Sequence, residues 1–385
     1  GTTTGIYRPG YSFLYWTLNA DGSGRRFYSG DLVNDFAASN GIPITLFANW
    51  QELETKVSFG VQTGGSFTHD DTGATSWTTT IARVTGEAPT VTAVAANGYH
   101  FVAWLDAASG AQVSSEAEFT PTRTGNFWPA TMSFIATFAP NTYTVSFDMG
   151  EGAGSVDDLT ATYGTAFRLP MATNASRTGY TFGGWTTGSD GSGTLIGDGE
   201  SVKNLTGAAG GKVTLYAYWE VAAYTLTING NGGAYNTASA YGSNLKPDGT
   251  LQFPLNAFAT MHLPAANAFL RTGYVLDGWS ELAEGAVTYI PGATYTMPTG
   301  NATLYAHWTP ITYTVSFSPN SNDTTGSMTS VTFTYDVEQA LPGNGFSRVG
   351  YDFAGWKTAT GTTVYGDRAS LSNLTSQAGA DVLLY

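Results

Sequence analysis

The side chains with the most chemical potential in this chain are its histidines. The four histidines are His69, His100, His262 and His307. None is paired with another at a metal-ligand spacing, and the chain has no cysteine that would complete a zinc site. His307 occupies a variable position in a repeated strand motif, so we expect it to face solvent. These residues therefore predict neither a metal site nor a catalytic site.

Other patterns with possible chemistry are equally weak. The chain has no G-x-S-x-G string for a nucleophile. The Gly-rich strings at 150–154 and 229–233 match no phosphate-binding motif, and we expect hairpin loops there. The acidic pairs Asp70-Asp71 and Asp157-Asp158 offer oxygen ligands for calcium, but they have no EF-hand spacing, so solvated loops are the simpler interpretation. We expect no enzyme activity, no cofactor and no metal.

Aromatic side chains are abundant, and exposed ones can stack on sugars. Most tryptophans recur at fixed strand positions, as a core requires. We expect Trp185, Trp219, Trp279, Trp308 and Trp356 to be core residues. Trp77 and Trp128 lie outside the repeated motifs, and they are the possible ligand-binding aromatics.

These residues must be positioned by repeated elements, and one motif, R-x-G-Y-x-F-x-G-W, recurs along the chain. It occupies 177–185, 271–279 and 348–356, with a further copy at 8–16 and a weaker one at 97–104. The glycine before each tyrosine suits a turn with positive φ or a close backbone approach. The recurring residues are Gly10, Tyr11, Trp16, Gly179, Tyr180, Trp185, Gly273, Tyr274, Trp279, Gly350, Tyr351 and Trp356.

Two further motifs complete each unit. The string T-L-Y-A-x-W at 214–219 and 303–308 is matched at 45–50, and it places Trp219, Trp308 and Trp50 at equivalent positions. A third motif, such as Tyr143–Phe147, opens each unit. All three alternate large apolar residues with small or polar ones, which predicts half-buried strands. Single helical turns are expected near Asn204 and Asn373, with a polar cap.

The spacing of the motifs predicts a serial array of modules of about 80 residues, large enough for small cores. Residues 1–52 are the C-terminal part of a repeat, 53–140 a divergent repeat, 141–221 and 222–310 whole repeats, and 311–385 a repeat lacking its last strand end. The joints are short and two contain proline, so we expect an extended and fairly stiff array. Because the chain starts and stops inside a repeat, we expect it to be a fragment of a longer protein.

Composition narrows the possible partners. The 385 residues include 15 basic and 29 acidic side chains, which gives a net charge of −14. The basic residues are scattered without a patch, so nucleic acid is not an expected partner. No apolar run is long enough to insert into a membrane. Low lysine and glutamate with many small, polar and aromatic residues favours an exported protein.

The motifs resemble the Listeria–Bacteroides repeat, the B-repeat type of internalins and many bacterial surface proteins. The resemblance covers 141–385 well and 1–52 partly. Residues 53–140 depart from it, because the string that contains Asn97 lacks the arginine and Phe138 stands in place of a tryptophan. It implies a β-grasp-like module in an extracellular stalk or adhesive region at the cell surface, and the family has no catalytic residues to carry over.

Three functions follow as hypotheses. The first is a non-enzymatic stalk or adhesin segment that projects or forms a cell-surface structure. The second is a subunit of an extracellular fibre, assembled by strand completion between chains. The third is a carbohydrate-binding module centred on 53–140. The expected partners are a protein or glycan on a host or neighbouring cell, or copies of the chain itself.

Overall fold

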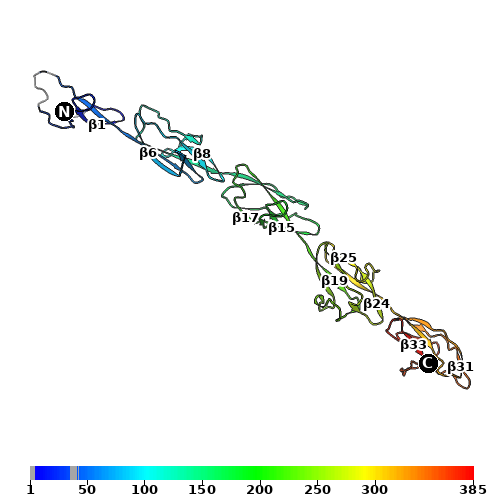
Figure 1. Ribbon diagram of the computed structural model, residues 1–385. Helices are drawn as coiled ribbons and strands as arrows, with labels where there is room; N and C mark the ends of the chain where they lie inside the picture. The colour runs from blue at the N-terminus through cyan, green and yellow to red at the C-terminus, as the bar shows by residue number, and fades with distance from the viewer. Residues whose placement is uncertain (1–4, 35–40, 42) are drawn as a thin grey trace. The chain divides into compact units, whose positions relative to one another are not determined.

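The structure, a computed structural model, describes residues 5–34, 41 and 43–385 (Figure 1). Nearly all regular structure in these residues is β, and one 3-10 turn, η1 (Gly242–Asn244), is present. The mainly β class is therefore confirmed, whereas the β-grasp-like detail is not. No helix in the described part of the chain is both long and apolar enough to cross a membrane.

The chain divides into two compact units. The first comprises Gly1–Ala175 and Gly184–Tyr218, and the second comprises Ser176–Gly183 and Trp219–Tyr385. The boundary crosses strands β15 (Tyr180–Thr186) and β18 (Lys212–Val221). We call the strand sets β1–β2, β3–β11, β12–β18, β19–β26 and β27–β33 modules one to five.

Module one is an antiparallel pair, and module two has two sheets with a shared core. Aromatic rings from both sheets, including Phe59, Phe67 and Trp104, meet between them. The pair is β1 (Tyr11–Thr17) with β2 (Phe47–Glu52). The larger sheet of module two has the order β6 (Ser76–Ala82), β3 (Glu54–Val61), β11 (Thr131–Pro140), β8 (Tyr99–Asp106) and β9 (Gln112–Ser114). The smaller sheet has the order β10 (Glu118–Phe119), β7 (Val91–Ala95), β4 (Gly65–His69) and β5 (Thr72–Ala74).

Modules three to five each have one main sheet and short accessory pairs. Module three has the order β13 (Leu159–Thr162), β12 (Thr142–Asp148), β18, β15 and β16 (Leu195–Ile196), plus β14 (Phe167–Arg168) with β17 (Ser201–Val202). The main sheet of module four has the order β21 (Leu251–Asn256), β19 (Ala223–Asn229), β26 (Ala302–Pro310) and β24 (Tyr274–Ser280). Its accessory pairs are β20 (Ala234–Tyr235) with β23 (Phe269–Leu270), and β22 (Thr260–His262) with β25 (Thr294–Thr296). The main sheet of module five has the order β29 (Val331–Thr334), β27 (Thr312–Phe317) and β33 (Asp381–Leu384). Its accessory pairs are β28 (Thr324–Gly326) with β31 (Phe346–Arg348), and β30 (Gln339–Ala340) with β32 (Ser370–Leu371).

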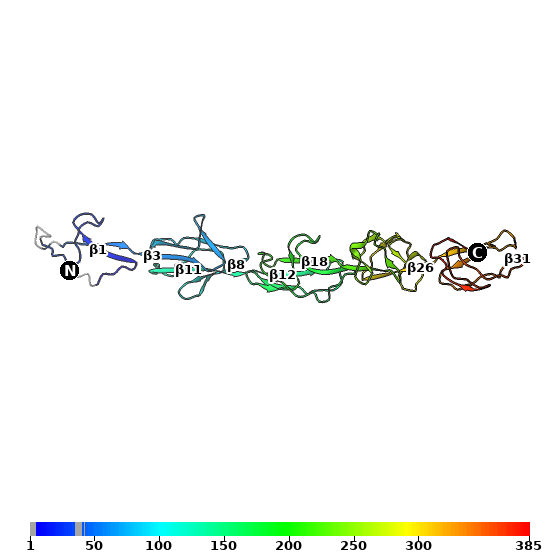
Figure 2. The ribbon, with the colours of Figure 1, turned by 90° about the horizontal axis from the view of Figure 1, so that it is seen from below.

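In modules two to five, the first strand pairs in parallel with the last. The pairs are β3 with β11, β12 with β18, β19 with β26, and β27 with β33. Figure 2 shows β12 beside β18 and β3 beside β11. Parallel pairing requires the intervening chain to cross over, so each module closes on itself before the next one begins.

The tryptophan of the G-Y-x-F-x-G-W motif is buried in the core of modules three to five. Trp185, Trp279 and Trp356 are at most 1% exposed. The tryptophans of the second motif, Trp219 and Trp308, are half-buried, as are Trp16 and Trp50 in module one.

The single helical turns expected near Asn204 and Asn373 are absent. Both asparagines have left-handed backbones, with φ of 56° and 58°. Their side-chain oxygens accept the backbone N–H groups of Gly164 and Asp336 at 2.5 and 2.6 Å. Asparagine tolerates positive φ, and here it bridges two loops instead of capping a helix.

Candidate functional site at the module junctions

A single residue separates the last strand of each module from the first strand of the next. Each junction residue donates its backbone N–H to the carbonyl of the glycine in the G-Y motif, at 2.8 or 2.9 Å. The four pairs are Leu53 with Gly10, Asn141 with Gly98, Ala222 with Gly179, and Ile311 with Gly273. Each pair lies within one of the two compact units.

The carbonyl of each junction residue accepts a second hydrogen bond from the module that follows. The donors are the backbone N–H groups of Arg83, Tyr163, Ala257 and Tyr335, at 2.8 to 3.0 Å. Every junction is thus a short ladder that connects the glycine turn of one module to the following module. Both polar groups of the junction residue are satisfied, as a buried backbone requires.

A side chain of the next module packs directly against the glycine of each junction. A Cβ at Gly98 or Gly273 would lie 2.3 or 2.2 Å from the ring of Tyr163 or Tyr335. At Gly10 and Gly179 the covering atoms belong to Val84 and Phe258, both at 2.4 Å. No side chain larger than hydrogen fits against such neighbours.

Gly350 in module five provides an internal comparison. Its φ of 83° matches those of the other four, which run from 76° to 85°. It is exposed, and a Cβ there would meet no atom within 4 Å, whereas the other four glycines are buried. All five glycines thus have the positive φ that the sequence suggested, and four also have the close approach.

The arginine of the motif braces the tyrosine that follows the glycine. The guanidinium carbon lies 3.8 to 4.0 Å from the ring centroid, within cation–π range. The pairs are Arg8 with Tyr11, Arg177 with Tyr180, Arg271 with Tyr274, and Arg348 with Tyr351. Sequence reasoning found the recurrence of this arginine but not its role, although its fixed three-residue spacing from the tyrosine was a usable signal.

The junction between modules four and five adds a charged network. The Tyr274 hydroxyl donates to Asp336 at 2.7 Å, and the Asn373 amide donates to the other oxygen of Asp336 at 2.7 Å. These two hydrogen bonds, first that from Tyr274, hold the pKa of Asp336 below its ordinary value. The hydrogen bond to Asp336 raises the pKa of Tyr274 in turn.

The other junctions have different polar chemistry. Glu52 accepts the backbone N–H groups of Thr85 and Val84 at 2.7 and 2.5 Å, and the Thr85 bond is the largest cause of its lowered pKa. Asn141 is 5% exposed, and its amide donates to the Gly207 carbonyl at 2.7 Å while its oxygen lies 2.9 Å from Nδ1 of His100.

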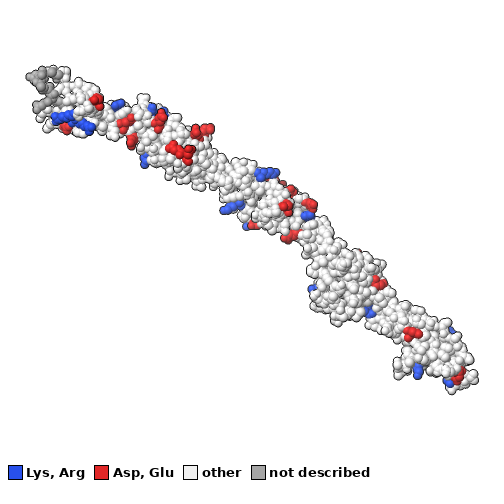
Figure 3. Space-filling model, in the orientation of Figure 1, with Lys and Arg blue, Asp and Glu red and all other residues white. Residues whose placement is uncertain are grey.

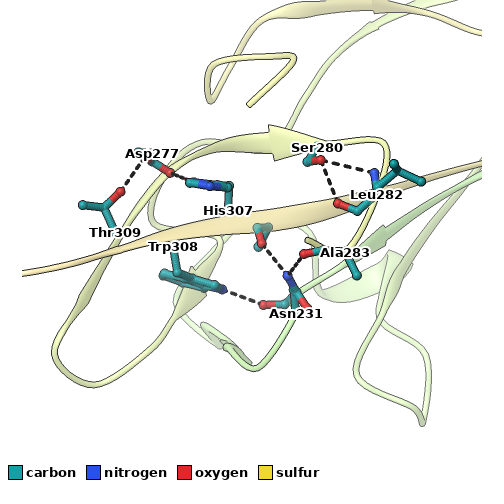
Figure 4. Close-up of polar contacts among 10 residues, drawn as sticks. Asn231, Asp277, Ser280, Leu282, Ala283, His307, Trp308 and Thr309 are labelled. Carbon is teal, nitrogen blue, oxygen red and sulfur yellow. Dashed lines mark hydrogen bonds and ion pairs between the residues drawn. The ribbon is translucent and has the colours of Figure 1, made fainter. Parts of the chain in front are cut away.

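The Gly-rich loop 229–233 covers a tryptophan. Figure 4 shows Trp308 donating to the Gly230 carbonyl at 2.9 Å, and Asn231 donating to the carbonyls of Ala283 and Ala306. A Cβ at Gly233 would lie 2.3 Å from the indole of Trp308. Gly233 is therefore needed for packing on the tryptophan.

His307 lies in a small polar cluster at a β-bulge (Figure 4). Its Nδ1 is 2.7 Å from Asp277, whose other oxygen accepts the Thr309 hydroxyl at 2.6 Å. Burial acts to raise the pKa of Asp277, and the hydrogen bonds from Thr309 and His307 outweigh it and lower that pKa. The His307 side chain is 37% exposed, which fits the expected solvent-facing strand residue.

Neither predicted ligand aromatic presents a free face. Trp128, one of the possible ligand-binding aromatics, is 5% exposed, and its indole donates to the Gly86 carbonyl at 2.9 Å. Trp77 is half-buried, and the ring of His69 stacks on it at 3.9 Å with an interplanar angle of 6°. A sugar ring would have to displace that histidine.

The candidate metal ligands are dispersed. Within residues 5–34, 41 and 43–385, no group of three histidine, cysteine, aspartate or glutamate side chains is arranged to hold a metal ion. Asp70 and Asp71 lie between β4 and β5 with φ of 46° and 60°, which is the geometry of a two-residue hairpin turn.

Comparison with known families agrees with the repeated junctions. The model of the Listeria-Bacteroides repeat domain matches residues 143–218, 224–307 and 313–379, more than half of the chain. The chain belongs to the Listeria-Bacteroides repeat family. A second model, the divergent InlB B-repeat domain, matches residues 56–142. The segment 53–140, which differs from the other repeats in sequence, is thus matched by a different family model from theirs.

Among curated proteins, two relatives come from Evansella cellulosilytica. One, "Putative Gly-rich membrane protein", is 31% identical over 184 residues, which cover 48% of this chain and 20% of the relative. The other, "Putative membrane protein", is 27% identical over 232 residues, 59% of this chain and 30% of the relative. The matches thus span less than a third of either relative.

Among solved structures, the Bacillus anthracis TIE protein aligns with 98% of this chain and 75% of its own. The sequence identity is 8% and the TM-score is 0.25, which is too low to indicate a common fold.

Proposed function

We propose that the chain is a non-enzymatic segment of a bacterial cell-surface protein, in which coupled modules hold a more distal part away from the cell. The observation that carries this proposal is the junction, which recurs four times with the same two hydrogen bonds and the same covered glycine. A spacer needs neighbouring modules to resist bending, and a one-residue connection under a packed side chain supplies that resistance.

Two other observations support this assignment. The family is a repeat family, and the curated relatives are much longer proteins whose names place them in a membrane. An extracellular location on the surface is the simplest setting for such an array, with a protein or glycan of another cell as the partner of its distal part.

A fibre subunit, assembled by strand completion between chains, is the second candidate.

Small-angle X-ray scattering over a concentration series separates the two candidates. A compact globule of this length has a radius of gyration of about 21 Å. Five coupled modules in a row would give about twice that value by the same per-module scaling. A large value that is constant with concentration supports the spacer, and one that grows with concentration supports the fibre. A compact value would contradict both.

A pair of insertion variants tests whether the junctions determine the radius of gyration. Two glycines inserted after Asn141 should interrupt the ladder of one junction and lower the radius of gyration. Two glycines inserted after Ser109, in the exposed turn between β8 and β9, are the matched control and should leave it unchanged. Equal behaviour of the two insertions would show that the junction contacts do not set the shape.

A further inference from the structure

The β1 hairpin of module one differs from its counterparts at three neighbouring positions. In modules one, three, four and five, a short segment pairs with the central tryptophan. The pairs are the bridges Trp16 with Phe27, Trp279 with Tyr289 and Trp356 with Tyr365, and the strand pair Trp185 with Ile196. These pairs align the modules residue by residue. The three positions in module one hold Tyr15, Arg26 and Tyr28. The counterparts of Tyr15 are Gly184, Gly278 and Gly355; those of Arg26 are Leu195, Thr288 and Val364; and those of Tyr28 are Gly197, Ile290 and Gly366.

Modules three to five leave no room for a side chain at the first of these positions. A Cβ at Gly184 would lie 2.4 Å from the Ile196 carbonyl oxygen, and one at Gly278 would lie 2.2 Å from Val287. The short segment therefore covers the glycine directly. In module one a tyrosine occupies this position, and Trp16 and Phe27 still exchange two backbone hydrogen bonds, at 2.8 and 2.9 Å.

The three residues contact one another at the surface. The Arg26 guanidinium lies 4.6 Å from the Tyr15 ring centroid, and the Tyr15 and Tyr28 rings meet edge to face at 5.8 Å. Tyr28 is 54% exposed and Arg26 is exposed. Among the described residues, no carboxylate lies within ion-pair distance of Arg26. The guanidinium is held by a ring, and its hydrogen-bond donors remain open to solvent.

The adjacent Arg25 belongs to the other face of the same segment. Its guanidinium lies 5.1 Å from the ring of Phe27, which is buried. Consecutive side chains of an extended segment point to opposite sides, so Arg26 shares its face with Tyr28 and Arg25 does not. Figure 3 shows a blue patch of basic side chains near the N-terminal end. The nearby acid Asp31 is engaged by the Tyr28 backbone N–H at 2.7 Å.

The geometry points to a binding site for an acidic sugar at Tyr15, Arg26 and Tyr28. A guanidinium binds a carboxylate or sulfate through two parallel hydrogen bonds. The exposed ring of Tyr28 offers a π face to the C–H groups of a sugar ring. This function goes beyond the spacer role and does not depend on it.

A polysaccharide fits this site better than a nucleic acid. Duplex DNA has one charge per about 1.7 Å, and its binding requires many phosphate contacts. This chain has a net charge of −14 and offers one guanidinium on the face in question. A glycan with one acidic group per sugar or per disaccharide matches a single cation flanked by aromatic rings.

Calorimetric titration of the full chain with defined oligosaccharides tests the site. The probes are a heparin-derived hexasaccharide, an oligogalacturonate that has carboxylates only, and neutral maltohexaose. We expect binding of at least one acidic probe, weakening with added salt, and no binding of the neutral probe. Arg26→Gln should lower the affinity about tenfold, as expected for the loss of a charge-assisted contact.

The two adjacent arginines provide the matched control. Arg25→Gln removes the same charge one residue away, and it should lower the affinity by less than about threefold because a screened surface charge contributes little. Tyr28→Ala should weaken binding and Tyr28→Phe should not. Equal losses for Arg25→Gln and Arg26→Gln would show nonspecific attraction and overturn the proposal. Absence of binding to both acidic probes, or tighter binding of a 12-nucleotide single strand, would also overturn it.

Discussion

At the residue scale, the junction glycines have two separable roles. All five G-Y glycines have the same left-handed backbone, which costs other residues about 1 kcal/mol or more. Only four of them also lie beneath a side chain of the next module. Within these 385 residues Gly350 thus has the backbone requirement without the contact, so it serves as a control for the effect of packing.

Alanine substitutions should resolve the two roles. Gly350→Ala should cost about 1 kcal/mol, since only backbone strain is added. Gly273→Ala adds an overlap with the Tyr335 ring, and overpacking of this kind costs a further 1–3 kcal/mol or so. Calorimetric melting of both variants measures the difference as a larger downward shift for Gly273→Ala. Equal shifts would mean that Tyr335 moves aside at no cost.

The glycine was predictable from the sequence, whereas its partners were not. A glycine before a tyrosine in several repeats implies either positive φ or close approach, and both occur at Gly98. Tyr163, which covers Gly98, lies 65 positions further along the chain, and no local pattern identifies a contact at that distance. The cation–π role of Arg177 was missed for a related reason: its spacing from Tyr180 recurs, but spacing alone does not show a ring under a guanidinium.

At the element scale, one turn position in modules three to five has a left-handed backbone. It is filled by Gly164, Phe258 and Asp336, with φ of 81°, 63° and 59°. Glycine and aspartate tolerate that region, but phenylalanine there is strained. In modules three and five the preceding tyrosine covers the junction glycine. In module four the preceding residue is Ala257, and the ring of Phe258 takes over the contact with Gly179.

Transferring the aromatic ring from position 258 to position 257 should relieve the backbone strain and keep the junction contact with Gly179. Phe258→Gly removes about 1–2 kcal/mol of left-handed strain, which offsets the loss of a half-exposed ring, so the melting transition should change little. Hydrogen exchange of the Ala222 amide, which bonds Gly179, should become faster because the cover is gone. The double variant Ala257→Tyr/Phe258→Gly should restore slow exchange. Fast exchange in the double variant would contradict an equivalent role for the two rings.

Strand identity followed from period-two alternation, but strand pairing did not. The pattern of Tyr143–Phe147 predicts a strand, and β12 is present there. Its parallel partner β18 begins more than 60 residues later, and long-range register is not encoded in either segment alone. The helical turn expected at Asn204 failed because asparagine at a cap and asparagine at positive φ look alike in sequence.

At the scale of the whole molecule, the junctions share a backbone ladder but differ in charge. The junction of modules one and two uses the Glu52 carboxylate, and that of modules four and five uses Asp336. The junction of modules two and three uses the neutral Asn141 amide, and the next one places Phe258 on Gly179. The junctions should therefore differ in their response to acid.

Acidification should loosen the two carboxylate junctions and spare the others. Glu52 and Asp336 have lowered pKa values, so their contribution is complete above the ordinary range near pH 4 and is lost as the pH falls through the lowered values. Below pH 4, amide exchange at Thr85 and Asp336 should lose protection relative to Gly164 and Phe258 in the same sample. Arg8 near Glu52 and Arg271 near Asp336 keep their charge throughout, so the loss of amide protection reports protonation of the carboxylates.

The Asp336→Asn variant is the control. In it, exchange at position 336 should no longer depend on acid, while exchange at Thr85 still responds. Uniform loss of protection at all four amides would mean that acid unfolds the modules themselves.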